Sequence, residues 1–259
     1  MPLPSQVYLW DQRTLYIGPL AEPLNLSQGA ATLAVSLDHP IAFKTPDMAD
    51  EIECHSLLLP PGLKICVNTR NAIVVNCNLE PMGSDLAAFT EQMSEESNKV
   101  KYNLTNKELF QDSFRSIYEK QMNATDAYQV VQSLVKYASD RQTIQHKIDP
   151  RILSVIDNIK TNVDHNISIE ALAASIHLSV PRLVQLFKQQ TGVPIRRYRL
   201  WHRLFVTATN IGKGNSLTDA AVAAGFADSA HFSHSFRSML GMKPSLILSQ
   251  PNSIRINVS

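Results

Sequence analysis

A stretch of basic residues in the last third of the chain has the composition that contact with phosphate groups requires. Residues 171–218 contain no Asp or Glu. They carry seven Lys or Arg side chains, which are Arg182, Lys188, Arg196, Arg197, Arg199, Arg203 and Lys213. An ordinary solvated surface mixes both signs of charge, whereas a surface that meets a row of phosphates gathers positive charge. The pattern therefore predicts that this part of the chain binds nucleic acid.

Charge divides the rest of the sequence in the same way. The chain has 259 residues and a formal charge of only +1, yet residues 1–148 hold 12 Lys or Arg against 17 Asp or Glu, and residues 149–248 hold 11 against 6. Because the sign changes between two long segments, we predict two domains, each large enough for its own core. The predicted divisions are a first domain over residues 1–140, a polar linker over 141–148, a second domain over 149–248, and a disordered tail rich in Asn and Ser over 249–259.

An internal repeat indicates two similar helical units in the second domain. Residues 168–192 recur in outline as residues 217–241. In each copy a residue able to cap a helix, Ser168 or Ser216, precedes a short helical pattern, which is followed by a turn and a second helical pattern. Gly225 supplies the turn of the second copy. Each copy therefore predicts a helix-turn-helix.

The second helix of each unit is expected to bury one face and to expose the other. Helical spacing places Leu183 and Phe187 on the inward stripe of the first unit, and Phe232 and Phe236 on that of the second. The residues predicted on or beside the outward faces, as DNA contacts, are Pro181, Arg182, Gln185 and Lys188, then Ser229, Ala230, His231, His234 and Arg237. Polar side chains at such positions can hydrogen-bond base edges or phosphates. The alternative for His231 is that it only packs.

A helical pattern over residues 195–211 joins the two units. A helix of that length spans about 26 Å, and with its turns it can hold two recognition helices about 34 Å apart, which is one turn of B-DNA. Both could then enter consecutive major grooves on one side of the duplex. Arg196 and Arg197 at the start of this helix are predicted to neutralise DNA phosphates, whereas Arg199 and Arg203 can equally be solvated helix charges.

Residues 225–245, GFADSAHFSHSFRSMLGMKPS, resemble the signature of the AraC/XylS family of bacterial transcription regulators, and the resemblance covers about residues 149–248. It implies a tandem helix-turn-helix domain whose two outward faces read adjacent grooves of double-stranded promoter DNA. It also implies a regulator, most often an activator, that works with RNA polymerase. Family members commonly have Arg where this chain has Gln185 and His234, so we expect a recognition sequence with less guanine at those positions.

The first domain matches the family more weakly, through HSLLLPPGLKI at residues 55–65. The resemblance implies a small cupin-like β-barrel that binds a small-molecule effector or dimerises, which makes the chain an α+β protein. A metal-binding cupin needs several His and a carboxylate at one site, and only His39 and His55 lie in this region, so we expect neither a metal or cofactor nor an enzyme. Apolar stripes over about residues 106–138 indicate helices that pack on the β domain or pair two chains as a homodimer.

Several protein classes are disfavoured by what the sequence lacks. No apolar run approaches the roughly 18 residues of a membrane span, and the start has no secretory signal pattern, so a cytoplasmic protein is expected. The resemblance to AraC/XylS regulators implies that it is a bacterial protein associated with the nucleoid. Cys54, Cys66 and Cys77 lack CxxC spacing and are expected to be buried thiols rather than redox sensors. Two alternatives remain, a cupin enzyme with a DNA-binding appendage and an architectural DNA binder whose affinity depends on salt rather than sequence.

Overall fold

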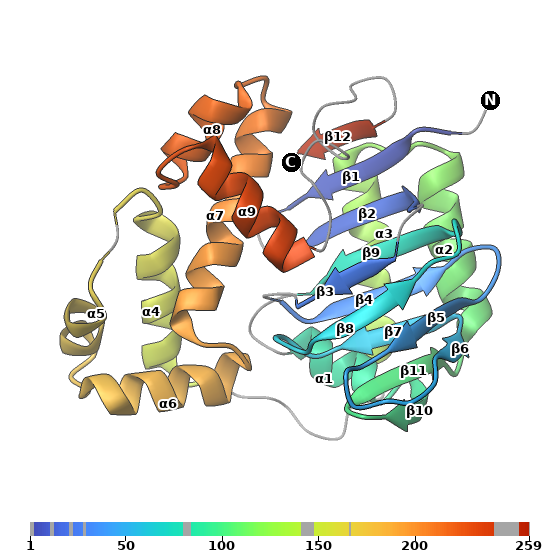
Figure 1. Ribbon diagram of the computed structural model, residues 1–259, viewed down its shortest axis with the longest axis horizontal. Helices are drawn as coiled ribbons and strands as arrows, with labels where there is room; N and C mark the ends of the chain where they lie inside the picture. Colours follow the sequence, from blue (N-terminus) through green and yellow to red (C-terminus); the bar gives the residue numbers. More distant parts are fainter. Residues whose placement is uncertain are drawn as a thin grey trace.

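A β-rich part and a helical part of the chain lie side by side in the computed structural model (Figure 1). The described residues are 3–10, 13–20, 23–27, 30–79, 84–140, 148–165, 167–240 and 254–258. Among the helices of these segments, none combines the length and the apolar character needed to cross a membrane. The arrangement confirms the predicted α+β class.

The β-rich part is built on two sheets. Its strands are β1 (Ser5–Leu9), β2 (Thr14–Pro19), β3 (Leu24–Leu26), β4 (Thr32–Ser36), β5 (Ile41–Lys44), β6 (Ile52–Cys54), β7 (Ser56–Leu59), β8 (Ile65–Asn68), β9 (Ile73–Asn78), β10 (Met93–Ser97), β11 (Val100–Leu104) and β12 (Ile254–Val258). The larger sheet has the order β10-β11-β7-β4-β9-β2-β1-β12, and the smaller has the order β3-β8-β5-β6. Phe43 and Val67 of the smaller sheet share a buried cluster with Leu57 and Val74 of the larger, so the two sheets pack face to face.

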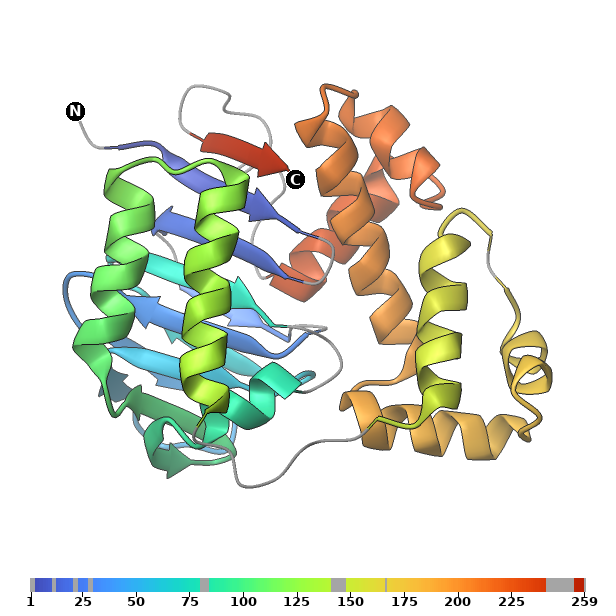
Figure 2. The same ribbon diagram turned by 180° about the vertical axis from the view of Figure 1, so that it is seen from behind.

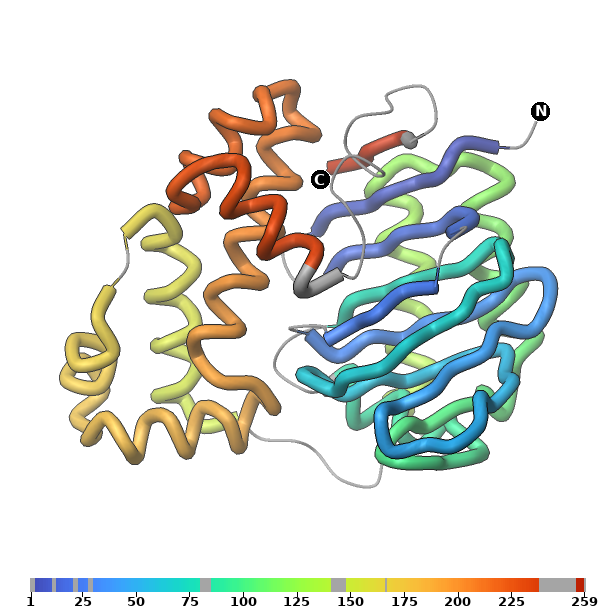
Figure 3. Tube along the Cα trace, viewed as in Figure 1, coloured from blue at the N-terminus to red at the C-terminus, as the bar shows by residue number. Residues whose placement is uncertain are grey.

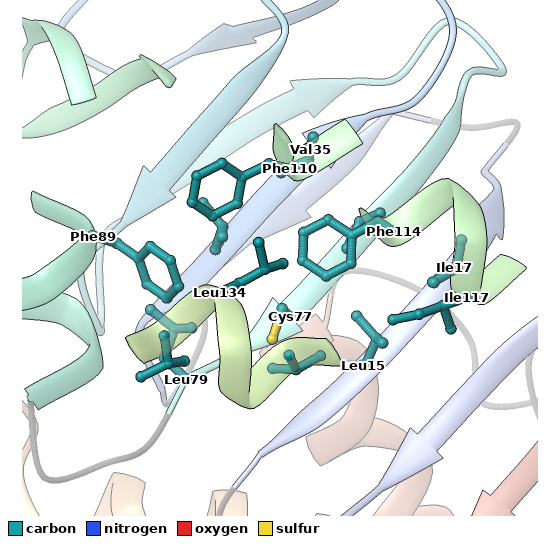
Figure 4. Packing of buried hydrophobic residues seen from close by; sticks show 14 of the residues in the cluster. Leu15, Ile17, Val35, Cys77, Leu79, Phe89, Phe110, Phe114, Ile117 and Leu134 are labelled. Carbon is teal, nitrogen blue, oxygen red and sulfur yellow. The ribbon is translucent and has the colours of Figure 1, made fainter. Parts of the chain in front are cut away.

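Three helices cover the other face of the larger sheet (Figure 2). They are α1 (Ser84–Thr90), α2 (Lys107–Glu119) and α3 (Ala124–Ser139). Phe110 and Phe114 of α2 and Leu134 of α3 meet Leu15 and Ile17 of the sheet in one buried cluster (Figure 4). The apolar stripes of α2 and α3 therefore pack on the β domain, which is the first of the two interpretations given above.

The helical part contains two small cores. Its helices are α4 (Pro150–Thr161), α5 (Ile169–Ser175), α6 (Val180–Thr191), α7 (Ile195–Gly212), α8 (Leu217–Ala223) and α9 (Ser229–Leu240). One core joins α4 to α5, α6 and the start of α7, and the other joins α7 to α8 and α9. The caps follow the prediction at Ser168 and Ser216, whose side chains each accept a backbone N–H at 3.1 Å. Ser179 also occupies a cap position, but its side chain makes no capping hydrogen bond.

The prediction of a disordered tail over residues 249–259 is wrong for its end. Residues 254–258 form β12, which pairs in parallel with β1 at the edge of the larger sheet. Residues 249–253 and 259 lie outside the described segments, as do residues 141–147 of the predicted linker. Ile148, the last predicted linker residue, packs against the core of the first helical unit.

Candidate nucleic-acid interface

The first unit presents the predicted contact residues on one side of α6. Leu183, Leu186 and Phe187 are buried against α4 and α5, as the helical spacing predicted. The outward residues, which we define as the α6 face, are Pro181, Arg182, Gln185 and Lys188, and all four are exposed. Within this face the Nη1 of Arg182 donates a hydrogen bond to Oε1 of Gln185 at 3.0 Å. The pair leaves the amide N–H groups of Gln185 available to an acceptor such as a base edge.

The second unit presents an equivalent side of α9. Phe232 and Phe236 are buried in the second core. The outward residues, which we define as the α9 face, are Ser229, Ala230, His231, His234 and Arg237. All of these are exposed except Ser229, which is half-buried. The two units thus place polar side chains at matching positions on their second helices.

His231 differs from its neighbours on the α9 face because it takes part in the turn before the helix. Its backbone N–H donates to Oδ1 of Asp228 at 2.7 Å, and its ring packs edge-on against Phe226. Its Nδ1 accepts the backbone N–H of Ala227 at 3.5 Å, which is a long contact. The packing alternative for this residue is therefore supported by contacts, and its DNA contact stays a prediction.

The turns of the two units share one backbone conformation. Gly225 has a φ of +81°, and His177, at the matching position of the first unit, has a φ of +54°. In the second unit a β-carbon on Gly225 would lie 2.8 Å from the carbonyl oxygen of Val163, so the turn sits directly against the end of α4. Glycine signalled this conformation in the sequence, whereas His177 gave no such signal because histidine rarely adopts it.

The arginines on α7 do not all face solvent. Arg196 is exposed, but the Nη2 of Arg197 donates to both the carbonyl oxygen and the Oγ of Ser27 at 2.7 Å. Arg199 donates to the carbonyl of Ile167, and Arg203 lies beside Gly225. The predicted DNA contact at Arg197 thus conflicts with this arrangement, since consecutive helix residues point about 100° apart and Arg197 points at the β domain.

Helices α6 and α9, the predicted recognition helices, do not run parallel in this structure. In the view of Figure 1, α6 lies almost horizontally below α7, whereas α9 crosses obliquely in front of it, and the Cα trace in Figure 3 shows the same relation. Two parallel helices would appear parallel in every view, so the axes of α6 and α9 point in different directions (Figure 1). Two helices that enter consecutive major grooves one turn apart are related nearly by a translation along the duplex, and they would be parallel.

The boundary between the two parts of the chain contains a basic pocket of about 600 Å³. Lys44, Lys64 and Arg197 contribute positive charge to it, Leu26 and Ile65 contribute apolar surface, and the described residues of its lining include no Asp or Glu. Burial lowers the pKa of the Arg197 guanidinium, because the charged form loses hydration. Neither Lys44, at the end of β5, nor Lys64, within the HSLLLPPGLKI segment, was predicted as a site residue, because nothing in the sequence indicates that they lie near Arg197.

Metal-binding chemistry has no cluster to support it in the described segments. None of these segments brings together three His, Cys, Asp or Glu side chains that could hold a metal ion. His39 lies at the surface, where its Nε2 is 3.1 Å from the carbonyl oxygen of Arg70. His55 is half-buried, and burial together with the charge of Lys107 lowers its pKa.

The helical part of this chain is similar to known helix-turn-helix proteins. A family model described as a helix-turn-helix domain matches residues 172–250. A curated relative, the uncharacterized HTH-type transcriptional regulator YidL of Escherichia coli (strain K12), is 30% identical over 113 residues. That match covers 43% of this chain and only 37% of the relative's length.

Solved structures of ToxT from Vibrio cholerae are similar over nearly the whole chain. One has a TM-score of 0.57 at 12% identity and covers 91% of this chain and 97% of its own. An apo form has a TM-score of 0.62 at 10% identity, with 92% and 97% covered. A form bound to an unsaturated fatty acid has a TM-score of 0.58 at 12% identity, with 92% and 95% covered. At such identities the likeness concerns the fold alone.

Proposed function

We propose that the chain is a transcription regulator of the AraC type, which binds specific double-stranded DNA through the α6 face and the α9 face. Each face would enter one of two adjacent major grooves, with Arg196 on a phosphate. The observation that carries the proposal is the duplicated design, in which two matching polar faces stand on helices whose opposite sides are buried in separate cores. Activation, through contact with RNA polymerase, is the family's usual mode.

Regulation in this proposal follows from the different directions of α6 and α9. A DNA-competent form would bring the two helices parallel, and the described arrangement would be a second form of the same protein. A small molecule or a partner chain that binds one form better shifts the population toward it. A homodimer through residues 106–138 would use the polar outer sides of α2 and α3. The site of action is the nucleoid, in the cytoplasm.

Sequencing the genomic fragments that the purified chain retains at physiological salt tests the proposal. A shared motif with two contact blocks about one helical turn apart is the expected result. Guanine should be less frequent at the bases that face Gln185 and His234 than in the binding sites of family members that carry Arg at these two positions. Retention of fragments without any shared motif, with affinity set by salt alone, would instead favour an architectural DNA binder and overturn the proposal.

Single substitutions separate base contacts from phosphate contacts. We expect Gln185→Ala and His234→Ala to change the sequence preference, because their side chains face base edges in the proposed complex. Arg196→Ala should weaken binding to all sequences and reduce the slope of log affinity against log salt by about 1. Lys99→Ala in the turn between β10 and β11 removes the same charge from an exposed position outside both faces and outside residues 106–138, and serves as the matched control. Equal effects from all four variants would contradict the assignment.

The basic pocket supports a second, finer proposal, that the effector is a small carboxylate with an apolar chain. Three cations with no acidic residue in the described lining favour an anion, and a pocket of about 600 Å³ lies within the usual range for small ligands. An anion beside Arg197 would compensate for the hydration that this guanidinium loses on burial. Two of the similar solved structures are of ToxT bound to an unsaturated fatty acid and to a substituted butenoic acid.

Cys66 provides a direct report on this pocket, because it is the half-buried cysteine of the three and lines the pocket wall. Burial raises the pKa of Cys54 and of Cys77 to about 12, so both stay protonated and enclosed at pH 8. A maleimide should therefore label one thiol per chain, at Cys66, in the folded protein. Mass spectrometry of the labelled peptides measures this.

A binding carboxylate should slow that labelling and raise the melting temperature, whereas the alcohol of the same chain length should do neither. Lys64→Ala should remove most of the effect, and Lys120→Ala, which deletes an exposed charge outside the pocket, should leave it unchanged. Equal protection by acids and alcohols would rule out an anion site. Rapid labelling of Cys54 or Cys77 would contradict the burial of these thiols.

A further inference from the structure

The chain returns to the β-rich part after it has completed the helical part. Strand β12 lies beyond α9 in the sequence, yet it pairs with β1 along five positions, from Ser5 opposite Ile254 to Leu9 opposite Val258. Among the described strand pairs it is the parallel one, whereas the others are antiparallel. The helical part is therefore attached to the β-rich part at both of its ends, through residues 141–147 and through β12.

The two sides of β12 contact different parts of the molecule. The methyl groups of Ile256 and Val258 lie against Gly212, the last residue of α7, where a β-carbon would be 2.9 Å and 2.7 Å from them. On the other side, Arg255 donates to the carbonyl oxygen of Gln121, between α2 and α3, at 3.3 Å. Because no side chain fits at Gly212, the end of α7 rests directly on the strand.

Helix α7 is thus held by the β-rich part at three positions. At its start, Arg197 donates to Ser27. In its middle, Trp201 and Leu204 share a buried cluster with Ala30. At its end, Gly212 meets β12. Because α7 joins the two helix-turn-helix units, contacts that hold α7 also restrict how α6 and α9 can move relative to each other.

We propose that β12 is a latch that keeps the two recognition helices out of parallel and so holds DNA affinity low. Release of β12 from β1 removes the contact at Gly212 and leaves α7 held on the β-rich part only near its start, at Ser27, and in its middle, at Ala30, among the contacts described above. Five residues of parallel edge pairing form a short ladder, which suits an element that opens. The inference rests on the proposed function, because it assigns a regulatory device to the same DNA-binding faces.

Two variants test the latch in opposite directions. A chain ending at residue 253 lacks β12 and should bind DNA about tenfold more tightly than the full chain, within the range usual for coupling between sites. A Val7→Cys/Ile256→Cys chain, made in a Cys66→Ser background, places two thiols at paired positions of adjacent strands. Its oxidised form should bind more weakly than its reduced form, which is the same polypeptide and therefore the matched control.

The probe is a labelled 40-base-pair duplex taken from the fragments that the full chain retains, with a random duplex of equal length beside it. Equal affinity of the truncated, oxidised and full chains would overturn the latch while leaving specific DNA binding intact. Light scattering during each titration reports the mass of the protein. A dimer of the full chain that dissociates on truncation would show that β12 pairs with a second copy, which also overturns the latch.

Two measurements without DNA keep the latch testable if no form binds either duplex, a result that would defeat the proposed function. Hydrogen exchange of the α7 amides should be faster in the truncated chain and slower in the oxidised chain than in the full chain. The radius of gyration from X-ray scattering should increase on truncation, because the contact between the end of α7 and β12 is lost. Unchanged exchange and an unchanged radius would overturn the latch.

Discussion

Replacement of Asp85 by Ala should lower the free energy of unfolding of the β-rich part by about 3–5 kcal/mol, the usual cost of leaving one partner of a buried ion pair alone. The carboxylate accepts two hydrogen bonds from Arg13, at 2.6 Å from Nε and 2.8 Å from Nη2. The side chain of Asp85 is 1% exposed and that of Arg13 is 4% exposed, so water cannot replace the lost partner. Arg13 also donates to Gln132 of α3 at 3.0 Å, which ties the pair to the helices that cover the sheet.

Fluorescence of Trp10 during urea unfolding measures this effect, because Trp10 lies in the same buried cluster as α1 and α3. A Trp201→Phe background removes the other tryptophan of the chain. Asp112→Ala, which breaks the exposed pair with Arg115 at 3.0 Å, is the matched control and should cost less than about 1 kcal/mol. A loss of similar size in both variants would mean that burial does not govern the strength of the Arg13 pair.

Replacement of Gly225 by Ala should destabilise the second helix-turn-helix unit by about 2–4 kcal/mol. The φ of +81° costs an L-residue about 1–2 kcal/mol, and the new β-carbon would lie 2.8 Å from the backbone oxygen of Val163. A carbonyl oxygen of the main chain cannot move aside as a flexible side chain does, so the turn itself must shift. DNA binding should fall with it, because the α9 face is positioned by this turn.

Gly214→Ala separates the two contributions. Gly214 also has a positive φ, of +95°, but nothing lies within 4 Å of its β-carbon position, so only the backbone cost of about 1–2 kcal/mol applies. Trp201 belongs to the core of the second unit, and its fluorescence in a Trp10→Phe background follows the unfolding of that unit. Equal decreases in the free energy of unfolding for both variants would show that the close approach to Val163 contributes nothing to the cost.

The helices of this protein could be predicted because their signals are local. The cap at Ser168, the cap at Ser216 and the stripe of Leu183 and Phe187 each lie within a few residues of the helix that they define, and the structure places them as expected. The strand order could not be predicted. The four residues of β7 are all buried, so they show no alternation that reveals a face, and their partners are distant in sequence.

The same distinction between local and distant signals applies to the candidate site. Helical periodicity alone identified the α6 face and the α9 face. It could not distinguish Arg196 from Arg197, because the β domain decides which side of α7 is covered. The basic pocket combines Lys44 and Lys64 with Arg197, residues far apart in sequence, and β12 pairs with a strand at the other end of the printed sequence. Both features depend on contacts between the two parts of the chain.

The larger sheet protects its two edges differently. Strand β10 carries the exposed charges of Glu95 and Glu96, which discourage pairing with another chain. Strand β1 has no such protection, since it is largely buried and apolar at Tyr8 and Leu9, and β12 covers it instead. An opened molecule would expose an uncharged strand edge that favours aggregation. Control by this strand therefore carries a risk of precipitation that rises with protein concentration.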